Sequence, residues 1–370
     1  MVFMQLLHSE HASRKVNGQA VLQAIVAANA PVSRAELARA LGLSKQTLSE
    51  IMGLLEKANW IQSVGTKQGA LGRAAVSYTL NPDVGYVVGV VFEGERFTVG
   101  LADMRGQLRI KKEGLLPAKA VADGAALGEY LINLVQGLAD NSGLPTNLIR
   151  QMVIGVPGIV DPSDVHIHHS PNLPALQTVD LRKMLAQKFL CGVQLDNDMN
   201  LHAYGEFRFG CSQKTQSSIF MGLGSGIGMG IMLGNQVWRG AKGWAGEIGY
   251  MPVDHQALSG EARERGALEL SLRAKKAESG LDAEQALDQV ARDCAFAIAC
   301  IVPVLDPEMI VLGGARGDDA RLHARLSHWL EVYSTEKITV RRSALGADAG
   351  LLGAVALGIQ ISQDQLFLMV

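Results

Sequence analysis

Residues 32–48 read VSRAELARALGLSKQTL, and the spacing of their polar and apolar side chains predicts two helices joined by a turn. Ser33, with Glu36 three residues later, has the capping-box pattern that marks the start of the first helix. Gly42 falls where a turn between two crossing helices requires a left-handed backbone. Ser44 is then expected to cap another helix that continues to about residue 58. The stretch therefore predicts a helix-turn-helix.

The sequence on either side extends this motif. Apolar residues at helical spacing predict a helix at 17–29. Strand-like residues that start at Trp60 and at Val76 flank a polar, Gly-rich stretch at 65–72, which predicts a wing. We expect residues 1–82 to form a winged helix-turn-helix domain.

A winged helix reads DNA with the N-terminal residues of one helix in the major groove, while the wing contacts the backbone or the minor groove. A helical hairpin used for dimerisation is the alternative interpretation. The side chains that we expect to contact DNA are polar or basic and lie at the start of the second helix of the motif or on the wing: Ser44, Lys45, Gln46, Thr47, Ser49, Lys67 and Arg73.

Charge is distributed unevenly along the chain. Residues 1–80 hold eight Lys and Arg against four Asp and Glu, a net charge of +4. The remainder holds 26 against 32, a net charge of −6. A basic head on an acidic body supports a DNA-contacting domain fused to a domain that does not contact DNA.

Composition indicates a chain with two or three domains and a large core, since 48% of its 370 residues are hydrophobic and 19% are charged. No apolar run reaches roughly 18 uncharged residues, and no signal-type apolar core is present at the N-terminus. We therefore expect a cytoplasmic, nucleoid-associated bacterial protein without a membrane partner. The four cysteines include no C-x-x-C pair and are expected to be reduced.

From Tyr86 onward, apolar strands alternate with helices, which predicts an α/β body whose sheets are covered on both faces. We expect two α/β lobes with a cleft between them. The first comprises residues 83–196 and about 355–370, and the second, which carries a dimerisation surface, comprises residues 197–354.

Several motifs occur in order along this body, and together they resemble the ROK family of repressors, open reading frames and sugar kinases. The resemblance covers residues 17–360 and is closest to the repressor branch with a fused winged helix. It implies a two-lobed, actin-like and sugar-kinase-like body. The motifs are Val156-Pro157-Gly158, Ser170 to Pro174, Asp196-Asn197-Asp198, Gly224 to Gly228, Arg239 to Gly249, Leu305 to Gly314, and Leu352-Gly353-Ala354.

The resemblance also implies a sugar site, because buried polar groups discriminate between sugars by their hydroxyl groups. In kinase relatives the residue that matches Asp198 is the general base. Tyr250 stands where relatives have a histidine that also contacts the sugar. The implied sugar-binding residues are Asn172, Asn197, Asp198, Glu247, Tyr250 and Glu269.

The chain departs from the kinase pattern at the phosphate loop. Where kinase relatives carry an Asp-x-Gly-Gly-Thr loop, this chain has Val91, Glu93 and Glu95. Two carboxylates near the phosphates would oppose nucleotide binding. We therefore expect no enzymatic activity and no catalytic residues.

The chain also departs from the family at its structural zinc. The positions that match the ligands are Tyr250, Gly260, Ala262 and Ala267, and none of them can replace a thiolate or an imidazole. We expect no zinc and no other cofactor. The run His166 to His169 is interpreted as a polar loop, with a metal-binding pair of histidines as the alternative.

These observations lead to one functional hypothesis and two alternatives. We expect a transcriptional regulator, most simply a repressor, that binds operator DNA as a dimer or tetramer and responds to a sugar held between the lobes. One alternative is a ROK sugar kinase that phosphorylates a hexose or amino sugar with ATP. The other is a repressor controlled by a protein partner without sugar binding.

Overall fold

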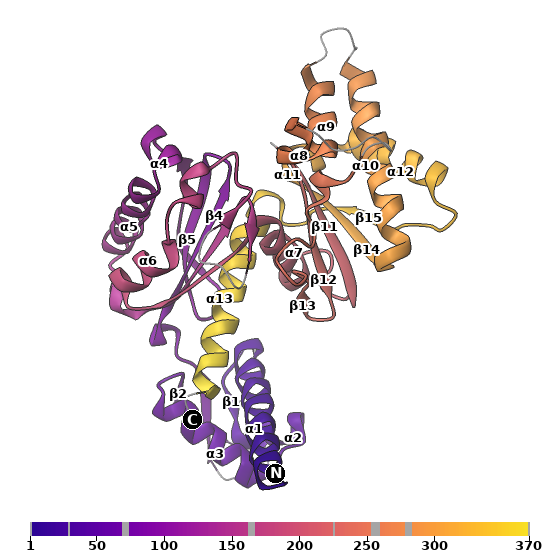
Figure 1. The fold of residues 1–370 in the computed structure, drawn as a ribbon. Helices are drawn as coiled ribbons and strands as arrows, with labels where there is room; N and C mark the ends of the chain where they lie inside the picture. Colours follow the sequence, from indigo (N-terminus) through magenta and orange to yellow (C-terminus); the bar gives the residue numbers. More distant parts are fainter. Residues whose placement is uncertain are drawn as a thin grey trace.

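The computed structural model describes residues 2–28, 30–68, 74–161, 167–224, 226–252, 260–277 and 283–368. Figure 1 shows a small head and two larger lobes, with a long C-terminal helix running from between the lobes to the head. Among the described helices, none has the length and apolar character needed to cross a bilayer.

The head contains a three-stranded sheet in the order β1-β3-β2 and three helices. Its capping box is confirmed: the Ser33 hydroxyl accepts the Glu36 amide, and the Glu36 carboxylate accepts the Ser33 amide at 2.7 Å. Gly42 has the predicted positive φ, 65°. The elements are α1 (Val2–Ala27), β1 (Val32–Ser33), α2 (Arg34–Leu41), α3 (Lys45–Lys57), β2 (Ile61–Gln68) and β3 (Ala74–Leu80).

The first helix is longer than the sequence predicted. Its apolar periodicity indicated a helix only from residue 17, whereas α1 begins at Val2. Residues 2–16 are rich in helix-favouring types such as Met, Leu, Gln and Lys but lack one-sided spacing, so a search for periodicity misses them.

The first lobe holds a five-stranded sheet in the order β10-β7-β4-β5-β6, in which β10, β7 and β4 are parallel. Helices α5 and α6 bury Leu127, Leu131 and Leu185 against its outer face. The elements are β4 (Tyr86–Glu93), β5 (Arg96–Asp103), β6 (Leu108–Leu115), α4 (Ala118–Ala122), α5 (Gly124–Asn141), β7 (Ile149–Val156), β8 (Ile159–Val160), β9 (Ile167–His168), α6 (Leu181–Phe189) and β10 (Gly192–Asn197).

The second lobe repeats this topology with the strand order β15-β14-β11-β12-β13, again an antiparallel meander followed by two parallel strands. Helices α9, α10 and α12 pack on its outer face. The elements are β11 (Ser217–Leu223), β12 (Ile227–Leu233), β13 (Gln236–Val237), α8 (Gly260–Arg265), α9 (Ala267–Ala277), α10 (Ala283–Leu305), β14 (Met309–Gly313), α11 (Gly314–Gly317), α12 (Ala320–Tyr333) and β15 (Val340–Arg342).

Two helices, α7 (Asp198–Phe209) and α13 (Ala349–Leu368), lie between the inner faces of the two sheets. Their backbones approach closely at two glycines. A Cβ at Gly353 would lie 1.9 Å from the Leu201 carbonyl, and one at Gly205 would lie 2.1 Å from the Ala349 carbonyl. The lobe boundary predicted at about residue 355 therefore falls inside α13, which is one continuous helix and packs on both sheets.

The head shares one hydrophobic core with the body. Val21 and Leu22 of α1 belong to the same buried cluster as Val87 of β4, Met104 and Phe367 of α13. The connection between head and body is also held by hydrogen bonds, since the Arg150 guanidinium donates to the Val84 carbonyl at 2.7 and 3.0 Å, and Arg105 donates to the Leu80 carbonyl at 3.2 Å.

Candidate functional site

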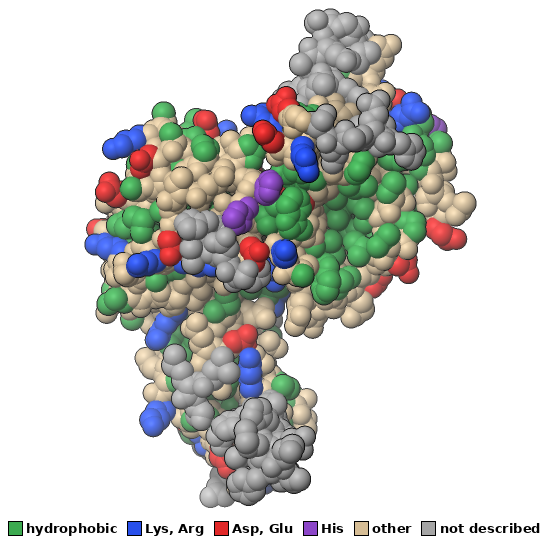
Figure 2. All heavy atoms as spheres, in the orientation of Figure 1, with side chains coloured by type: hydrophobic (Ala, Val, Ile, Leu, Met, Phe, Trp, Pro, Cys, Tyr) green, Lys and Arg blue, Asp and Glu red, His purple; other side chains and the backbone are tan. Residues whose placement is uncertain are grey.

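A cavity of about 350 Å³ opens between the two lobes, within the size range of small-molecule sites. All six residues that the resemblance assigned to a sugar site line it, although they come from distant parts of the chain. In Figure 2 histidine side chains gather where the lobes meet, beside hydrophobic surface of the second lobe. Asn172 lies on the loop after β9, Asn197 and Asp198 at the start of α7, Glu247 and Tyr250 around a short 3-10 helix at Ile248–Tyr250, and Glu269 on α9.

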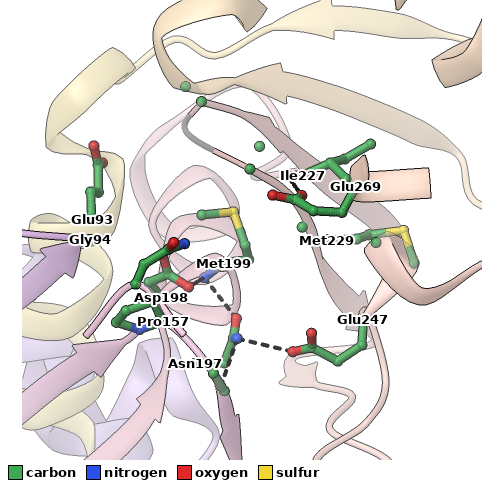
Figure 3. A pocket seen from close by; sticks show the side chains of 18 of the residues that line it. Glu93, Gly94, Pro157, Asn197, Asp198, Met199, Ile227, Met229, Glu247 and Glu269 are labelled. Carbon is green, nitrogen blue, oxygen red and sulfur yellow. Dashed lines mark hydrogen bonds between the residues drawn. The ribbon is translucent and has the colours of Figure 1, made fainter. Parts of the chain in front are cut away.

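Asn197 is the N-cap of α7 and is fixed by four hydrogen bonds. Its side-chain oxygen accepts the Met199 and Asn200 amides at 2.8 and 3.3 Å. Its amide group donates to the Gly158 carbonyl at 3.1 Å and to Glu247 Oε1 at 3.4 Å, so it joins the two walls of the cavity (Figure 3). The polar wall is thus held in place before any ligand binds.

Asp198 is buried at the first position of α7 and faces the cavity. Burial, which removes its carboxylate from water, raises the pKa of Asp198 to about 7, and the charge of Glu93 adds to this effect. Its Oδ1 accepts the Met199 amide at 3.0 Å. A carboxyl group with this pKa can accept a hydroxyl hydrogen bond as a carboxylate or donate one as an acid.

Glu247 and Glu269 form the opposite wall (Figure 3). Burial raises the pKa of Glu247 to about 7, helped by the charges of Asp198 and Glu269. Glu269 Oε2 accepts the Ile227 amide at 2.7 Å, which ties α9 to β12. The cavity therefore presents carboxyl and amide groups from both lobes, the groups that bind polyol hydroxyls.

A Glu93–His202 pair was missed by sequence reasoning. His202 Nε2 lies 3.6 Å from Glu93 Oε1, and its Nδ1 lies 2.8 Å from the Asp198 carbonyl oxygen. Burial lowers the pKa of His202, but the nearby Glu93 carboxylate and the Asp198 charge more than offset this and leave it raised. The nearby His202 ring in turn lowers the pKa of Glu93. No local pattern links residues on β4 and α7.

An ion pair behind the cavity connects the two lobes. Asp196 on β10 is 1% exposed, and Arg239, which follows β13, donates to both of its carboxylate oxygens, with Nε 3.1 and 3.2 Å away. Asn200 Nδ2 also donates to Asp196 at 3.0 Å. Both residues belong to motifs of the body, but nothing in the sequence predicted that they pair.

Aromatic rings close the rim of the cavity on the second-lobe side. His169, which follows β9, packs edge-on against Trp244 and Tyr250 with centroids 5.1 and 5.7 Å apart. The Tyr250 hydroxyl lies 3.3 Å from His169 Nδ1 and donates to the Glu264 carbonyl at 3.1 Å. His169 of the first lobe thus contacts two rings of the second. His166 lies outside the described residues, and within them no cluster of three metal-ligating side chains occurs.

The N-terminus of α3 forms the candidate DNA surface. Ser44 caps the helix by accepting the Thr47 amide at 3.0 Å, while its hydroxyl also lies 2.8 Å from that of Thr47. Lys45, Gln46 and Ser49 are exposed, and Gln46 donates to Glu50 at 3.3 Å. Of the two predicted wing residues, Lys67 lies on β2 with its side chain outside the described part, and Arg73 is outside it altogether.

The comparisons with known proteins match both parts of this arrangement. Residues 87–272 and 269–361 match the family model described as ROK family, and residues 19–62 match the model described as winged helix-turn-helix DNA-binding. The chain belongs to the ROK family. The resemblance seen in the sequence and the predicted fold class are thereby confirmed.

Relatives within the ROK family include regulators and kinases. A xylose repressor from Bacillus spizizenii is 29% identical over 259 residues, which cover 70% of this chain and 65% of that repressor. The crystal structure of a ROK family transcriptional regulator, a homologue of the E. coli MLC protein, has a TM-score of 0.78 at 21% identity and covers 97% of this chain and 98% of its own. The structure of a ROK hexokinase from Thermus thermophilus has a TM-score of 0.62 at 26% identity. The match covers 75% of this chain and 99% of the hexokinase.

The four positions that the resemblance matched to zinc ligands lie close together in sequence but carry no metal-binding groups. Gly260 and Ala262 lie on α8, Ala267 begins α9, and none of them carries a ligating group. The Tyr250 hydroxyl is instead hydrogen-bonded to the Glu264 carbonyl, which joins the 3-10 helix at 248–250 to α8. These residues do not fit a zinc ion.

The raised pKa values predict a pH dependence of stability. Asp198 has a pKa of about 7 in the fold and 3.8 as a free side chain, so the folded state retains a proton that the unfolded chain releases. Stability is therefore lost as the pH rises from about 4 to about 7, and Glu247 adds to the loss. In urea unfolding, the stability of Asp198→Asn relative to the natural chain should increase as the pH rises from about 4 to about 7. A difference that does not change with pH would contradict the assignment.

Proposed function

We propose that this ROK protein is a DNA-binding repressor of carbohydrate-uptake or catabolism genes, whose DNA affinity is controlled by a sugar bound between its lobes. The observation that carries the proposal is the presence, in one chain, of a winged helix with exposed donors and a cavity lined by fixed carboxyl and amide groups. The naming of relatives as xylose repressors supports it.

Three features of the cavity oppose a kinase function, and we propose that the protein transfers no phosphoryl group. The β4–β5 turn replaces the phosphate loop and presents Glu93 to the cavity. Glu93 would repel a triphosphate, whereas Glu95, which the sequence also placed near the phosphates, is exposed and does not line the cavity. The Met199 side chain packs against the Gly-rich β11–β12 hairpin, where a Cβ at Gly222 would lie 2.3 Å from its sulfur. This packing leaves less room for a nucleotide along the hairpin.

One observation favours a kinase, since an Asp198 pKa near 7 would suit a general base. Sugar binding and phosphoryl transfer can both be tested with one protein sample. Isothermal titration against D-xylose, D-glucose and N-acetyl-D-glucosamine, followed by a coupled assay for ADP, should show binding of at least one sugar and no ATP consumption beyond background. ATP-dependent phosphorylation of the bound sugar would overturn the assignment as a regulator without enzymatic activity.

The central test is operator binding with and without sugar. The purified protein selects its operator from random duplexes, and a mobility shift then measures affinity in the presence of each sugar. We expect at least one sugar to change the operator affinity. If a sugar binds the protein but none changes the affinity, control by sugar is wrong, and control by a protein partner becomes the better proposal.

Lys45→Ala should weaken operator binding uniformly across sequences and reduce the slope of log affinity against log salt by about 1, because it removes one exposed cation at the start of α3. Gln46→Ala should instead relax sequence preference, at a cost of about 1–3 kcal/mol on the preferred site. Fluorescence anisotropy over a salt series distinguishes the two effects. Lys57→Ala, at the far end of α3, is the matched control and should change neither the salt dependence nor the sequence preference of binding.

We also propose that the protein acts in the cytoplasm as a dimer or tetramer, so that two heads bind the two halves of a pseudo-palindromic operator.

A metal-free fold is a further part of the proposal. Elemental analysis of the purified protein should find well below one zinc per chain, and prolonged treatment with a chelator should leave the thermal midpoint unchanged. Stoichiometric zinc, or a midpoint that falls on chelation, would contradict it.

A further inference from the structure

Helix α13 reaches from the cavity to the core of the head. It has 20 residues, so its length is about 30 Å. In its first turn Gly350 contacts the ring of His202, since a Cβ there would lie 2.6 Å from Cε1. His202 itself lines the cavity. Figure 1 shows the helix emerging between the lobes and ending beside α1.

The last turns of α13 are built into the head. Phe367 is 9% exposed and packs on α1 so closely that a Cβ at Gly18 would lie 2.3 Å from its ring. Asp364 accepts a hydrogen bond from Gln19, the next residue of α1. The C-terminus of the body is thus part of the core that supports the DNA-reading helices.

The contact between α13 and α7 leaves little room for slippage. At Gly205 and Gly353 backbone meets backbone, so no flexible side chain can absorb a displacement. Asp198 and His202 lie on α7, and any shift of α7 that accompanies ligand binding must move α13 with it.

The head has a second attachment that does not involve α13. Arg150 and Arg105 hold the 80–84 connection to the first lobe. Helix α13 packs on both lobes, through Ala354 on the first and Ala356 on the second. A change in the angle between the lobes would therefore pull α13 away from its position against this connection. The head would tilt.

We propose that α13 transmits the state of the cavity to the DNA-reading head, with Phe367 and Asp364 as the positioning residues. This inference rests on the proposed function and names the regulation of the same site. It requires that the sugar bind with different affinity to the two states of the protein, which differ in the angle between the lobes and in the tilt of the head.

The test compares the operator dissociation constant with and without whichever of D-xylose, D-glucose or N-acetyl-D-glucosamine binds best. For the natural chain we expect a ratio of roughly 5 to 150. In Phe367→Ala the ratio should fall toward 1, while sugar affinity measured without DNA stays unchanged. Phe367→Leu should restore most of the ratio. Gln365→Ala, an exposed change in the same turn, should leave it intact.

The outcomes separate this inference from the proposed function. If the natural chain responds to sugar and Phe367→Ala responds equally, the role of α13 is wrong and the proposed function stands. If a sugar binds the natural chain without changing operator affinity, both the role of α13 and the control of DNA binding by sugar are wrong. Should Phe367→Ala lose DNA binding altogether, Gln19→Met decides, since it keeps the side-chain length but removes the amide that donates to Asp364. A reduced ratio supports the role of α13, and an unchanged ratio overturns it.

Discussion

Replacing Arg239 with methionine is expected to lower the free energy of unfolding by about 3 kcal/mol. The guanidinium neutralises Asp196, which is 1% exposed, so the substitution leaves a buried carboxylate whose charge no cation balances. Because domains are stable by only about 5–15 kcal/mol, this is a large fraction of the total. Urea unfolding followed by circular dichroism measures the loss.

Two further variants test the cause. Arg263→Met, an exposed change on α8, removes the same charge from the surface and should cost less than about 0.5 kcal/mol. The double variant Asp196→Asn with Arg239→Met removes the unpaired charge and should recover part of the loss. If the double variant is less stable than Arg239→Met alone, the electrostatic explanation is wrong.

Asp198→Ala should weaken sugar binding at least about 100-fold while leaving the protein as stable as before, or more stable, at neutral pH. The two effects have one origin. Burial disfavours the carboxylate and raises its pKa to about 7. Removing the carboxyl group therefore removes an unfavourable contribution to folding, but it also removes a hydrogen-bond acceptor for a sugar hydroxyl.

Isothermal titration with the best-binding sugar of the panel measures the affinity, and calorimetric unfolding measures stability on the same sample. Glu95→Ala is the matched control, because Glu95 is exposed on the adjacent turn and does not line the cavity. An unchanged sugar affinity in Asp198→Ala would remove Asp198 from the site, whatever the unfolding temperature.

The features that the sequence predicted best are those coded locally. The capping box at Ser33 and the left-handed Gly42 depend on neighbours within a few residues, and both occur as predicted. The six predicted sugar-binding residues were found through their resemblance to the ROK family, and all six line the cavity. Whether they bind a sugar remains a prediction.

The features that could not be predicted depend on tertiary contacts. Asp196 and Arg239 are 43 positions apart, and Gln19 and Asp364 are 345 apart. Neither pair has a periodic signature, because each partner is placed by a different sheet or helix. The lobe boundary predicted at about residue 355 falls inside α13 for a related reason: the helix is shared by both lobes, and only its tertiary contacts show this.

The shared core of head and body limits how this protein can be recombined. Val87, Met104 and Phe367 complete the apolar cluster of the head, yet none of them lies within residues 1–82. A chimera that receives only residues 1–82 from another regulator would pack a foreign head against Val87, Met104 and Phe367, which do not fit it. New DNA specificity is therefore better acquired by changing the exposed end of α3 than by exchanging the whole head, and an exchange must include the last turns of α13.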